Sequence, residues 1–170
     1  MTVIHGRVRK FGDNIDTDTI TPGVILQLPM AEMVKHAFEP ISPDFFETVK
    51  PGDIIVAGKN FGCGSSREHA TRVIKELGID FIVSESMARI YFRNCIALGL
   101  HPLLARGVTE LFMEGDEIEI DLDHGHVINP STGKRAFFRP LSGTPKQILD
   151  SGGILSLLKM ITDRASSNQH

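Results

Sequence analysis

The sequence predicts an α/β fold, a mixed sheet whose parallel core is covered by helices. Two short apolar runs, 53–57 and 79–84, are each followed by a helical pattern that ends at a glycine, and strands that alternate with helices in this way form parallel sheets. Alternating apolar residues at 115–122 add antiparallel strands. A chain of 170 residues has the length of one domain, so residues 1–170 are expected to fold as a single unit.

The first fifty residues contain one predicted strand and one predicted helix. Residues 3–10 form the strand, which leads into a loop that contains Asp16 and Asp18. Aspartates favour turns because their side chains accept hydrogen bonds from nearby backbone N–H groups; an Asp-x-Asp pair also offers the oxygen ligands that Mg²⁺ and Ca²⁺ prefer. Residues 30–38 follow as a helix with its apolar positions on one side, and prolines mark the connection after it.

The middle of the chain alternates strands and helices. The strand at 53–57 precedes a glycine-rich loop and a helix that Gly78 ends, and the strand at 79–84 precedes a helix at 86–98 that Gly99 ends. The apolar positions of the first helix have helical spacing, namely Ala70, Val73, Ile74 and Leu77. This order predicts strands that run in parallel.

The last third of the chain is predicted to contain a hairpin at 115–128 and a helical tail at 145–161 that a pair of glycines interrupts. The hairpin turn carries His124 and His126. Two histidines are a partial zinc ligand set, but no third ligand lies near them in the sequence, so a solvated turn is the favoured interpretation.

The segment from Gly58 to Ala70 is the most informative one, because glycines, two serines and an arginine lie directly before a helix. Glycines adopt positive φ angles and let a ligand approach the backbone. The first N–H groups of a helix lack partners and carry partial positive charge. The segment therefore predicts an anion site. Its spacing differs from that of a phosphate-binding loop, a dinucleotide fingerprint and the nucleophile elbow of hydrolases.

Ser65 has two interpretations on spacing alone. Ser65 and Glu68 have the spacing of a capping box, in which the serine only caps the helix. The other interpretation makes Ser65 a catalytic group at the helix start. Arg67 favours an anionic ligand, because a cation in the first turn opposes the helix dipole unless a negative group binds beside it.

Composition argues against several classes of protein. With 18 basic and 21 acidic residues, the chain has no positive excess for nucleic acid or an anionic membrane. Its apolar runs fall short of a membrane span and its first residues lack the pattern of a signal peptide, so we expect a soluble, cytoplasmic protein. Its two cysteines, Cys63 and Cys95, are too few to hold a four-iron cluster. Cys63 is expected to pack as a small apolar residue, the alternative being a reactive thiol.

Three segments together resemble a known family. Residues 58–70 resemble the signature of the swivel domain of the aconitase superfamily, and specifically the separate small subunits of isopropylmalate, homoaconitate and dimethylmalate dehydratases. Residues 12–20 resemble the family's early Asn-x-Asp-Thr-Asp motif and residues 86–94 resemble its second helix, in the same order and spacing. The resemblance covers about residues 3–130 and implies the swivelling β/β/α domain of that superfamily.

The resemblance implies that the chain is one subunit of a heteromeric hydro-lyase that isomerises or dehydrates a hydroxy dicarboxylate, above all 3-isopropylmalate and 2-isopropylmalate in leucine biosynthesis. It implies no cofactor on this chain and a four-iron cluster on a large subunit, in a heterodimer or heterotetramer. The alternatives are 2,3-dimethylmalate or homoaconitate as substrate, and a noncatalytic anion-binding swivel module. A stand-alone serine hydrolase lacks support, because no His and Asp stand at a recognisable spacing.

Matching positions carry over the family's roles. Ser65 would be the catalytic base, acting as an alkoxide that the loop N–H groups and Arg67 stabilise. Arg67 would also clamp a substrate carboxylate. The other implied positions are substrate contacts at Gly64 and Ser66 and supports at Asp16 and Asp18. Arg89 and Arg93 are either a second positive edge of the cleft or a solvated face.

Substrate choice is predicted from a short loop after the Asp-Thr-Asp sequence. Family members that bind an additional carboxylate carry an arginine there, whereas this chain has Gln27 among Ile25, Leu26 and Leu28. Burial of a carboxylate without a cation is costly. We therefore expect the loop to face a branched alkyl group.

Overall fold

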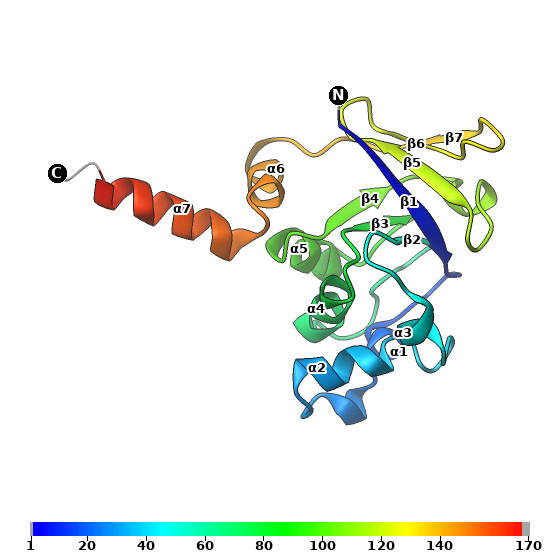
Figure 1. Cartoon of the computed structure of the whole chain (residues 1–170), viewed down its shortest axis with the longest axis horizontal. Coiled ribbons are helices and arrows are strands. Elements are labelled where there is room, and N and C mark those ends of the chain that lie inside the picture. Colours follow the sequence, from blue (N-terminus) through cyan, green and yellow to red (C-terminus); the bar gives the residue numbers. More distant parts are fainter. Residues whose placement is uncertain (1, 168–170) are drawn as a thin grey trace.

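The computed structural model describes residues 2–167, which form a seven-stranded mixed sheet with helices packed on it (Figure 1). The strands are β1 Val3–Lys10, β2 Ile54–Ala57, β3 Phe81–Ser84, β4 His101–Leu104, β5 Glu117–Asp121, β6 His126–Ile128 and β7 Arg135–Phe137. Their spatial order is β4, β3, β2, β1, β5, β6, β7. Strands β1 to β4 are parallel and the remaining pairings are antiparallel. The predicted α/β class with a parallel core is confirmed.

The helices occupy the connections and the C-terminal end. They are α1 Thr17–Ile20, α2 Met30–Met33, α3 Phe45–Thr48, α4 Glu68–Glu76, α5 Arg89–Ala97, α6 Gly143–Asp150 and α7 Ile154–Ser167, with 3₁₀ turns at Gly23–Ile25, Val34–His36 and Val108–Glu110. Helices α4 and α5 connect successive parallel strands and lie on the same side of them (Figure 1). Within residues 2–167, no helix is both long and apolar enough to cross a membrane.

Strand β1 joins the parallel and antiparallel halves of the sheet. Residues 8–10 pair in parallel with 54–56 of β2, whereas residues 3–7 pair antiparallel with 117–121 of β5. Because the two partners use different parts of β1, strands β5 to β7 can turn over one face of the parallel strands while the helices cover the other (Figure 1). This arrangement is the β/β/α layering that the family resemblance implies.

Each buried strand supplies two cores, because successive side chains point to opposite faces of a sheet. Ile55 and Ile82 face the helices, and Val56 and Val83 face the antiparallel strands. The helix-side core includes Phe11, Phe38, Phe45, Phe61, Ile74, Tyr91 and Cys95. The strand-side core includes Val8, Leu103, Phe112, Ile118, Ile120 and Val127.

Several elements differ from the prediction, including the short helices α1 and α3, which lie in segments predicted to be a loop and a connection. Strands β4 and β7 were not predicted, because β4 contains Pro102 and β7 has only three residues; a proline is tolerated in β4 since it is an edge strand. The helix predicted at 30–38 consists of only two short turns, which end at His36. Phe38 has a φ of 57°, which is outside the helical range. Phe38 is fully buried and stacks on Phe11 with ring centroids 4.3 Å apart, so core packing overrides the helical pattern.

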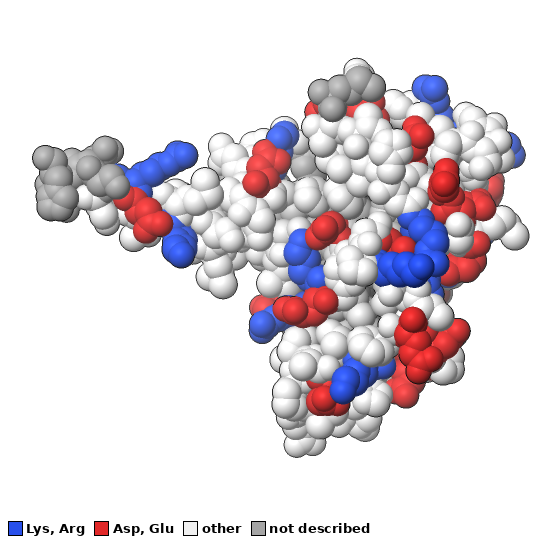
Figure 2. Space-filling view, in the orientation of Figure 1, with Lys and Arg blue, Asp and Glu red and all other residues white. Residues whose placement is uncertain are grey.

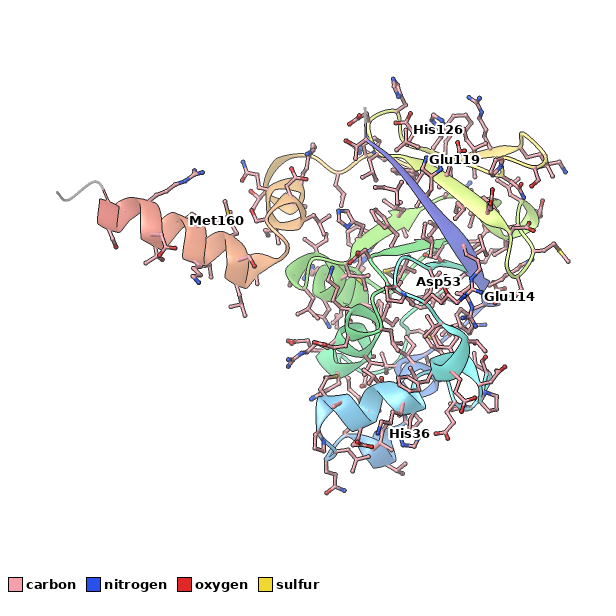
Figure 3. The ribbon with its side chains drawn as sticks, viewed as in Figure 1. His36, Asp53, Glu114, Glu119, His126 and Met160 are labelled. Carbon is pink, nitrogen blue, oxygen red and sulfur yellow. The ribbon has the colours of Figure 1, made fainter. Side chains whose placement is uncertain are left out.

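An ion network around the buried Asp53 ties β1 to the start of β2. The Asp53 carboxylate accepts hydrogen bonds from Arg7 Nη2 at 2.6 Å and from the backbone N–H of Lys50 at 3.0 Å. Arg9 lies 3.5 Å from Asp53, binds Glu114 at 2.8 Å and sits 4.5 Å from the centre of the Phe45 ring. Asp53 and Glu114 lie close together beside β1 (Figure 3).

Burial raises the pKa of Asp53, but the hydrogen bonds from Arg7 and Lys50 and the charges of Arg7 and Arg9 outweigh it and hold the pKa below its usual value. A carboxyl group with a depressed folded-state pKa stabilises the fold fully above its unfolded pKa, about 4. That contribution is lost as the pH falls toward and through the folded-state pKa.

We therefore expect Asp53→Asn to lower the free energy of unfolding by about 3 kcal/mol at neutral pH, because Arg7 and the buried Arg9 lose their shared partner. The difference from wild type should shrink below about pH 4. Urea unfolding at several pH values measures both effects. Asp150→Asn is the control, since the ion pair between Asp150 and Lys146 is exposed, and it should cost less than about 1 kcal/mol. A difference between Asp53→Asn and wild type that is independent of pH would contradict the assigned pKa direction.

Candidate active site

The candidate site lies at the carboxyl ends of the parallel strands, where three loops meet. Residues 11–16 follow β1, residues 58–67 follow β2, and residues 85–88 follow β3. In open α/β sheets, ligands bind at this edge because the loops and the helix N-termini converge there. The topology therefore places the predicted anion loop where the fold favours a ligand.

The loop at 58–67 is held between its two neighbours by backbone hydrogen bonds. On one side, the N–H of Gly62 donates to Ile15 O at 2.7 Å and the N–H of Thr17 donates to Cys63 O at 2.9 Å. On the other side, the N–H of Phe61 donates to Ser86 O at 3.1 Å and the N–H of Ala88 donates to Phe61 O at 2.9 Å. These bonds hold the loop between the segments that follow β1 and β3, and the loop pairs in parallel with both of them.

Two glycines allow the loop to pack closely. Gly62 has a φ of 73°, and a Cβ atom there would lie 2.1 Å from the ring of Tyr91. At Gly58, a Cβ atom would lie 1.9 Å from Asp13 Oδ1, and that same oxygen accepts a hydrogen bond from the N–H of Lys59 at 2.7 Å. The loop can approach its neighbours this closely only without side chains at these positions.

The capping box predicted for Ser65 and Glu68 is wrong. Helix α4 begins at Glu68, Arg67 occupies the N-cap position, and no side chain caps the helix. Gly64 has a φ of 98° and turns the chain before the serines, so Ser65 is exposed outside the helix. Within residues 2–167, the N–H groups of Ser65 and Ser66 donate to no backbone carbonyl. The serine side chain and the uncapped helix start are thus both open to a ligand.

Arg67 does not point freely into this space but forms an ion pair with Asp18 through Nη1. Asp18 is two-thirds exposed, whereas Arg67 is more buried, with a side-chain exposure of 29%. Gly23 lies against the pair, since a Cβ atom there would be 3.2 Å from Asp18 Oδ1 and 3.3 Å from Arg67 Nη1. The loop predicted to face the variable part of the substrate therefore begins beside the arginine.

Asp16 and Asp18 have different structural roles. Asp16 Oδ1 accepts a hydrogen bond from the N–H of Thr19 at 2.7 Å and caps the short helix α1, as the turn interpretation predicts. Asp18 instead holds Arg67. Asp16 thus stabilises the segment that follows β1, and Asp18 positions the arginine of the loop that follows β2.

The predicted substrate loop is divided between core and solvent. Ile25 and Leu26 are half-buried and pack against the helix-side core, whereas Gln27 and Leu28 are exposed. Val24, which the sequence analysis did not single out, is 84% exposed. The apolar surface that this loop offers to a ligand therefore comes mainly from Val24 and Leu28.

The cysteines and histidines do not form a metal centre in the described part of the chain. Within residues 2–167, no three or more His, Cys, Asp or Glu side chains are grouped so as to hold a metal ion. Cys95 is fully buried, and burial raises the pKa of its thiol; Cys63 is half-buried in the site loop. His124 is paired with Asp121 at 2.8 Å in the hairpin turn. These residues do not fit an iron–sulfur cluster.

Sequence reasoning missed the residues that support the loop. Asn14 and Asn60 both have left-handed backbone conformations, with φ values of 56° and 58°, and their side chains bond to each other at 3.0 Å. The hydroxyl oxygen of Ser86 accepts a hydrogen bond from the N–H of Asn60 at 2.9 Å. Asparagine is one of the few residues that tolerate this conformation, so its place beside glycines was the available signal. Arg89 and Arg93, which the sequence left open, are both exposed on α5.

Comparisons with known proteins agree with this architecture. Residues 9–106 match the family described as the aconitase C-terminal domain. The chain is 48% identical to 3-isopropylmalate dehydratase small subunit 1 of Methanopyrus kandleri, covering 96% of both chains. It is 44% identical to the isopropylmalate/citramalate isomerase small subunit of Methanocaldococcus jannaschii, covering 93% of this chain and 95% of the relative.

The crystal structure of 3-isopropylmalate dehydratase (LeuD) from Methanocaldococcus jannaschii superposes with a TM-score of 0.92 and 40% identity, over 98% of this chain and 99% of that one. The β/β/α layers are thus those of an aconitase-type C-terminal domain. The chain belongs to this family and, within it, to the 3-isopropylmalate dehydratase small subunits.

Because the loop depends on the contact between Gly62 and Tyr91, we expect Gly62→Ala to destabilise the chain by about 3 kcal/mol, from overpacking together with the positive φ. Gly107→Ala is a matched control, since Gly107 has a φ of 75° and open space where a Cβ atom would lie. That substitution should cost only about 1 kcal/mol. Urea unfolding compares the two variants. Equal losses would show that the ring contact does not constrain the loop.

Proposed function

We propose that this chain is the small subunit of a heteromeric hydro-lyase that interconverts 3-isopropylmalate and 2-isopropylmalate. The observation that carries the proposal is the exposed Ser65 beside an uncapped helix start and an arginine. These groups can bind a carboxylate and hold a base next to it. The names of the relatives, which include dehydratase and isomerase small subunits, support the same reaction and imply a large-subunit partner.

Ser65 is proposed as the base. The reaction breaks a C–H bond beside a carboxylate and removes the hydroxyl of the neighbouring carbon, and water then adds back with the opposite regiochemistry. Ser65 Oγ, as an alkoxide, would take the carbon-bound proton. The open N–H groups of the loop and helix start, together with the Arg67 charge, favour the anionic oxygen. A positioned base of this kind typically contributes about 10²- to 10⁴-fold.

Arg67 is proposed to bind a substrate carboxylate while Asp18 holds it. The ion pair uses Nη1, and a guanidinium group has further N–H donors in a fixed plane. Asp18 would thus orient the remaining donors toward the space in front of Ser65, where Ser66 and Gly64 supply backbone N–H groups. An ammonium group cannot replace this geometry, because it has no planar fork.

The rest of the site is proposed to come from the large subunit. The described residues of this chain do not fit a cluster, given the buried Cys95 and the lack of a ligand group within residues 2–167. A four-iron cluster on the large subunit would supply a Lewis acid for the departing hydroxyl. The small subunit then contributes the base, the carboxylate clamp and the loop that contacts the variable part of the substrate.

The proposed substrate carries a branched alkyl group rather than a third carboxylate. Residues 22–30 contain no lysine or arginine, and Val24 and Leu28 are the exposed apolar residues of this loop. A carboxylate facing them would lose its hydration without gaining a cation. A small alkyl group, by contrast, gains apolar contacts.

We expect the enzyme assembled with its large subunit to turn over 3-isopropylmalate with a kcat/KM at least about 100-fold above that for homoaconitate, because binding of the additional carboxylate lacks a partner. Steady-state kinetics with both substrates, and with citramalate as a substrate that has a smaller alkyl group, measure the preference. Equal or greater activity on homoaconitate would contradict the substrate assignment.

In the same assembled enzyme, Ser65→Ala and Arg67→Lys should have different kinetic effects. Loss of the base should lower kcat by about 10²-fold or more with little change in KM. Loss of the planar fork should raise KM by about tenfold or more.

Ser131→Ala, an exposed serine in the turn before β7, is the control and should match wild type. If Ser65→Ala retained near wild-type turnover, Ser65 would not be the base. An unchanged KM in Arg67→Lys would contradict the clamp.

A further inference from the structure

A cavity of about 120 Å³ lies beneath helix α6, at the edge of the strand-side core. Its walls come from β4, from the segment after β5, from α6 and from the loop before α6. The leucine and phenylalanine side chains that line it are Leu103, Leu122, Phe138, Leu141 and Leu149. Leu103 and Phe138 belong to the strand-side core. The cavity is therefore a recess in the packed interior of the fold.

His101, the first residue of β4, forms a further wall of this cavity. Its ring stacks on Phe81, with ring centroids 4.5 Å apart. Burial lowers the pKa of His101, so the imidazole carries no charge at neutral pH. A buried water molecule needs about three polar partners, which walls of leucine and phenylalanine do not supply. The inner part of the cavity therefore favours an alkyl group over water.

The mouth of the cavity is charged. The charged residues that line the cavity are Lys146, Asp150 and Asp123, and all three are exposed. Lys146 Nζ donates to Asp150 Oδ2 at 2.5 Å across one turn of α6, and Asp123 Oδ2 accepts a hydrogen bond from the N–H of Thr2 at 2.7 Å. Figure 2 shows adjacent positive and negative side chains on α6, with largely uncharged surface around them. The mouth therefore offers both signs of charge to a ligand.

The cavity lies at the edge of the parallel strands opposite the candidate active site. The site loops follow the carboxyl ends of these strands, whereas the cavity borders the start of β4 and the segment after β5. Phe81 pairs with His101 at the starts of β3 and β4, and Val3 at the start of β1 pairs with Asp121 at the end of β5. The four residues of β3 separate the two edges by about 13 Å. A ligand in the cavity would therefore leave the space in front of Ser65 open.

We propose that this cavity binds a free α-amino acid whose branched aliphatic side chain has about four carbon atoms. An apolar protein cavity of roughly 150 Å³ holds benzene, so 120 Å³ suits a somewhat smaller alkyl group. The side chain of the ligand would enter between Leu103, Leu122 and Leu149. Its carboxylate would bind Lys146, and its ammonium group would bind Asp150. The exposed pair that these two residues form opens to a ligand at little cost.

The charges at the mouth favour an amino acid over other occupants with the same alkyl group. A carboxylic acid would bring its negative charge beside Asp123 and Asp150 without a cation of its own. An alkyl amine would bind these carboxylates but leave Lys146 without a new partner. A leucine side chain of a partner protein would bring neither charge to the mouth. Only a zwitterion forms a charge-assisted hydrogen bond with each sign.

The test titrates the full-length chain with L-leucine, whose isobutyl group has the required size, by isothermal titration calorimetry. We expect a dissociation constant of about 1 mM, which is reasonable for so small a ligand. Two other probes share the isobutyl group but lack one charge: 3-methylbutylamine has no carboxylate, and 4-methylpentanoate has no ammonium group. Each should bind about fivefold more weakly. L-Alanine, which has the same charges without the branched group, should show no saturable binding.

Two substitutions test the two parts of the cavity separately. Leu122→Trp fills the apolar part and should weaken L-leucine binding at least about tenfold. Lys146→Gln removes the partner of the carboxylate and should weaken binding about fivefold. Met113→Trp and Lys159→Gln are the matched controls and should bind like wild type, because both residues are exposed and neither lines the cavity. Circular dichroism checks the fold, and Lys146→Gln tests the site even if Leu122→Trp fails to fold, since Lys146 is exposed.

Methyl NMR shows where L-leucine binds. The methyl signals of Leu103, Leu122 and Leu149 should shift on titration, whereas those of Ile25 and Leu26 near Arg67 should not. Shifts confined to Ile25 and Leu26 would place the amino acid at the anion loop and overturn the proposal. So would equal affinity for all three isobutyl probes, or no saturable binding up to about 20 mM. The measurements require neither the large subunit nor turnover, so their outcome is independent of the proposed function.

Discussion

The close contact between Gly62 and the ring of Tyr91 is the constraint on which the candidate site depends. Tyr91 is 2% exposed and packs edge-on against Phe61, with ring centroids 5.5 Å apart. The ring therefore belongs to the helix-side core and is not free to move aside. The loop contacts this ring at Gly62, so the rigid core fixes the position of the loop residues that follow Gly62. Ser65 and Arg67 are thus positioned by packing beneath the loop rather than by bonds within it.

The charges around the loop determine what it can bind. The start of α4 has no side-chain cap, and Arg67 at its N-cap position is already paired with Asp18. Under the proposed function, a substrate carboxylate would add to this pair while Asp18 stays bound to Arg67. Such an arrangement keeps the arginine oriented while no substrate is bound, which lowers the ordering cost of binding.

Local sequence patterns predicted most of the fold and the chemical character of the site. Short apolar runs marked β2 and β3, and the helical spacing of apolar residues marked α4, because buried strands and amphipathic helices each leave a local pattern in the sequence. The glycine–serine–arginine loop predicts an anion site from local features alone, namely glycines, serines and an arginine directly before a helix. Strand β4 was not recognisable, since its Pro102 is acceptable only at a sheet edge, and edge position is a property of the whole sheet.

The sequence by itself determined which residue types meet at the site: two serines, an arginine and two aspartates at fixed spacing from strand ends. Only the tertiary structure decided their roles. Ser65 does not cap α4, because Gly62 and Gly64 turn the chain before the helix begins. Asp18 can pair with Arg67 because β1 and β2 are neighbours in the sheet. Likewise, apolar side chains of α7 such as Leu155 and Ile161 are exposed although the glycine pair at 152–153 packs on the end of α5. The physical reason is the same throughout, since periodicity and capping are local, whereas contacts between residues far apart depend on how the strands are ordered and packed.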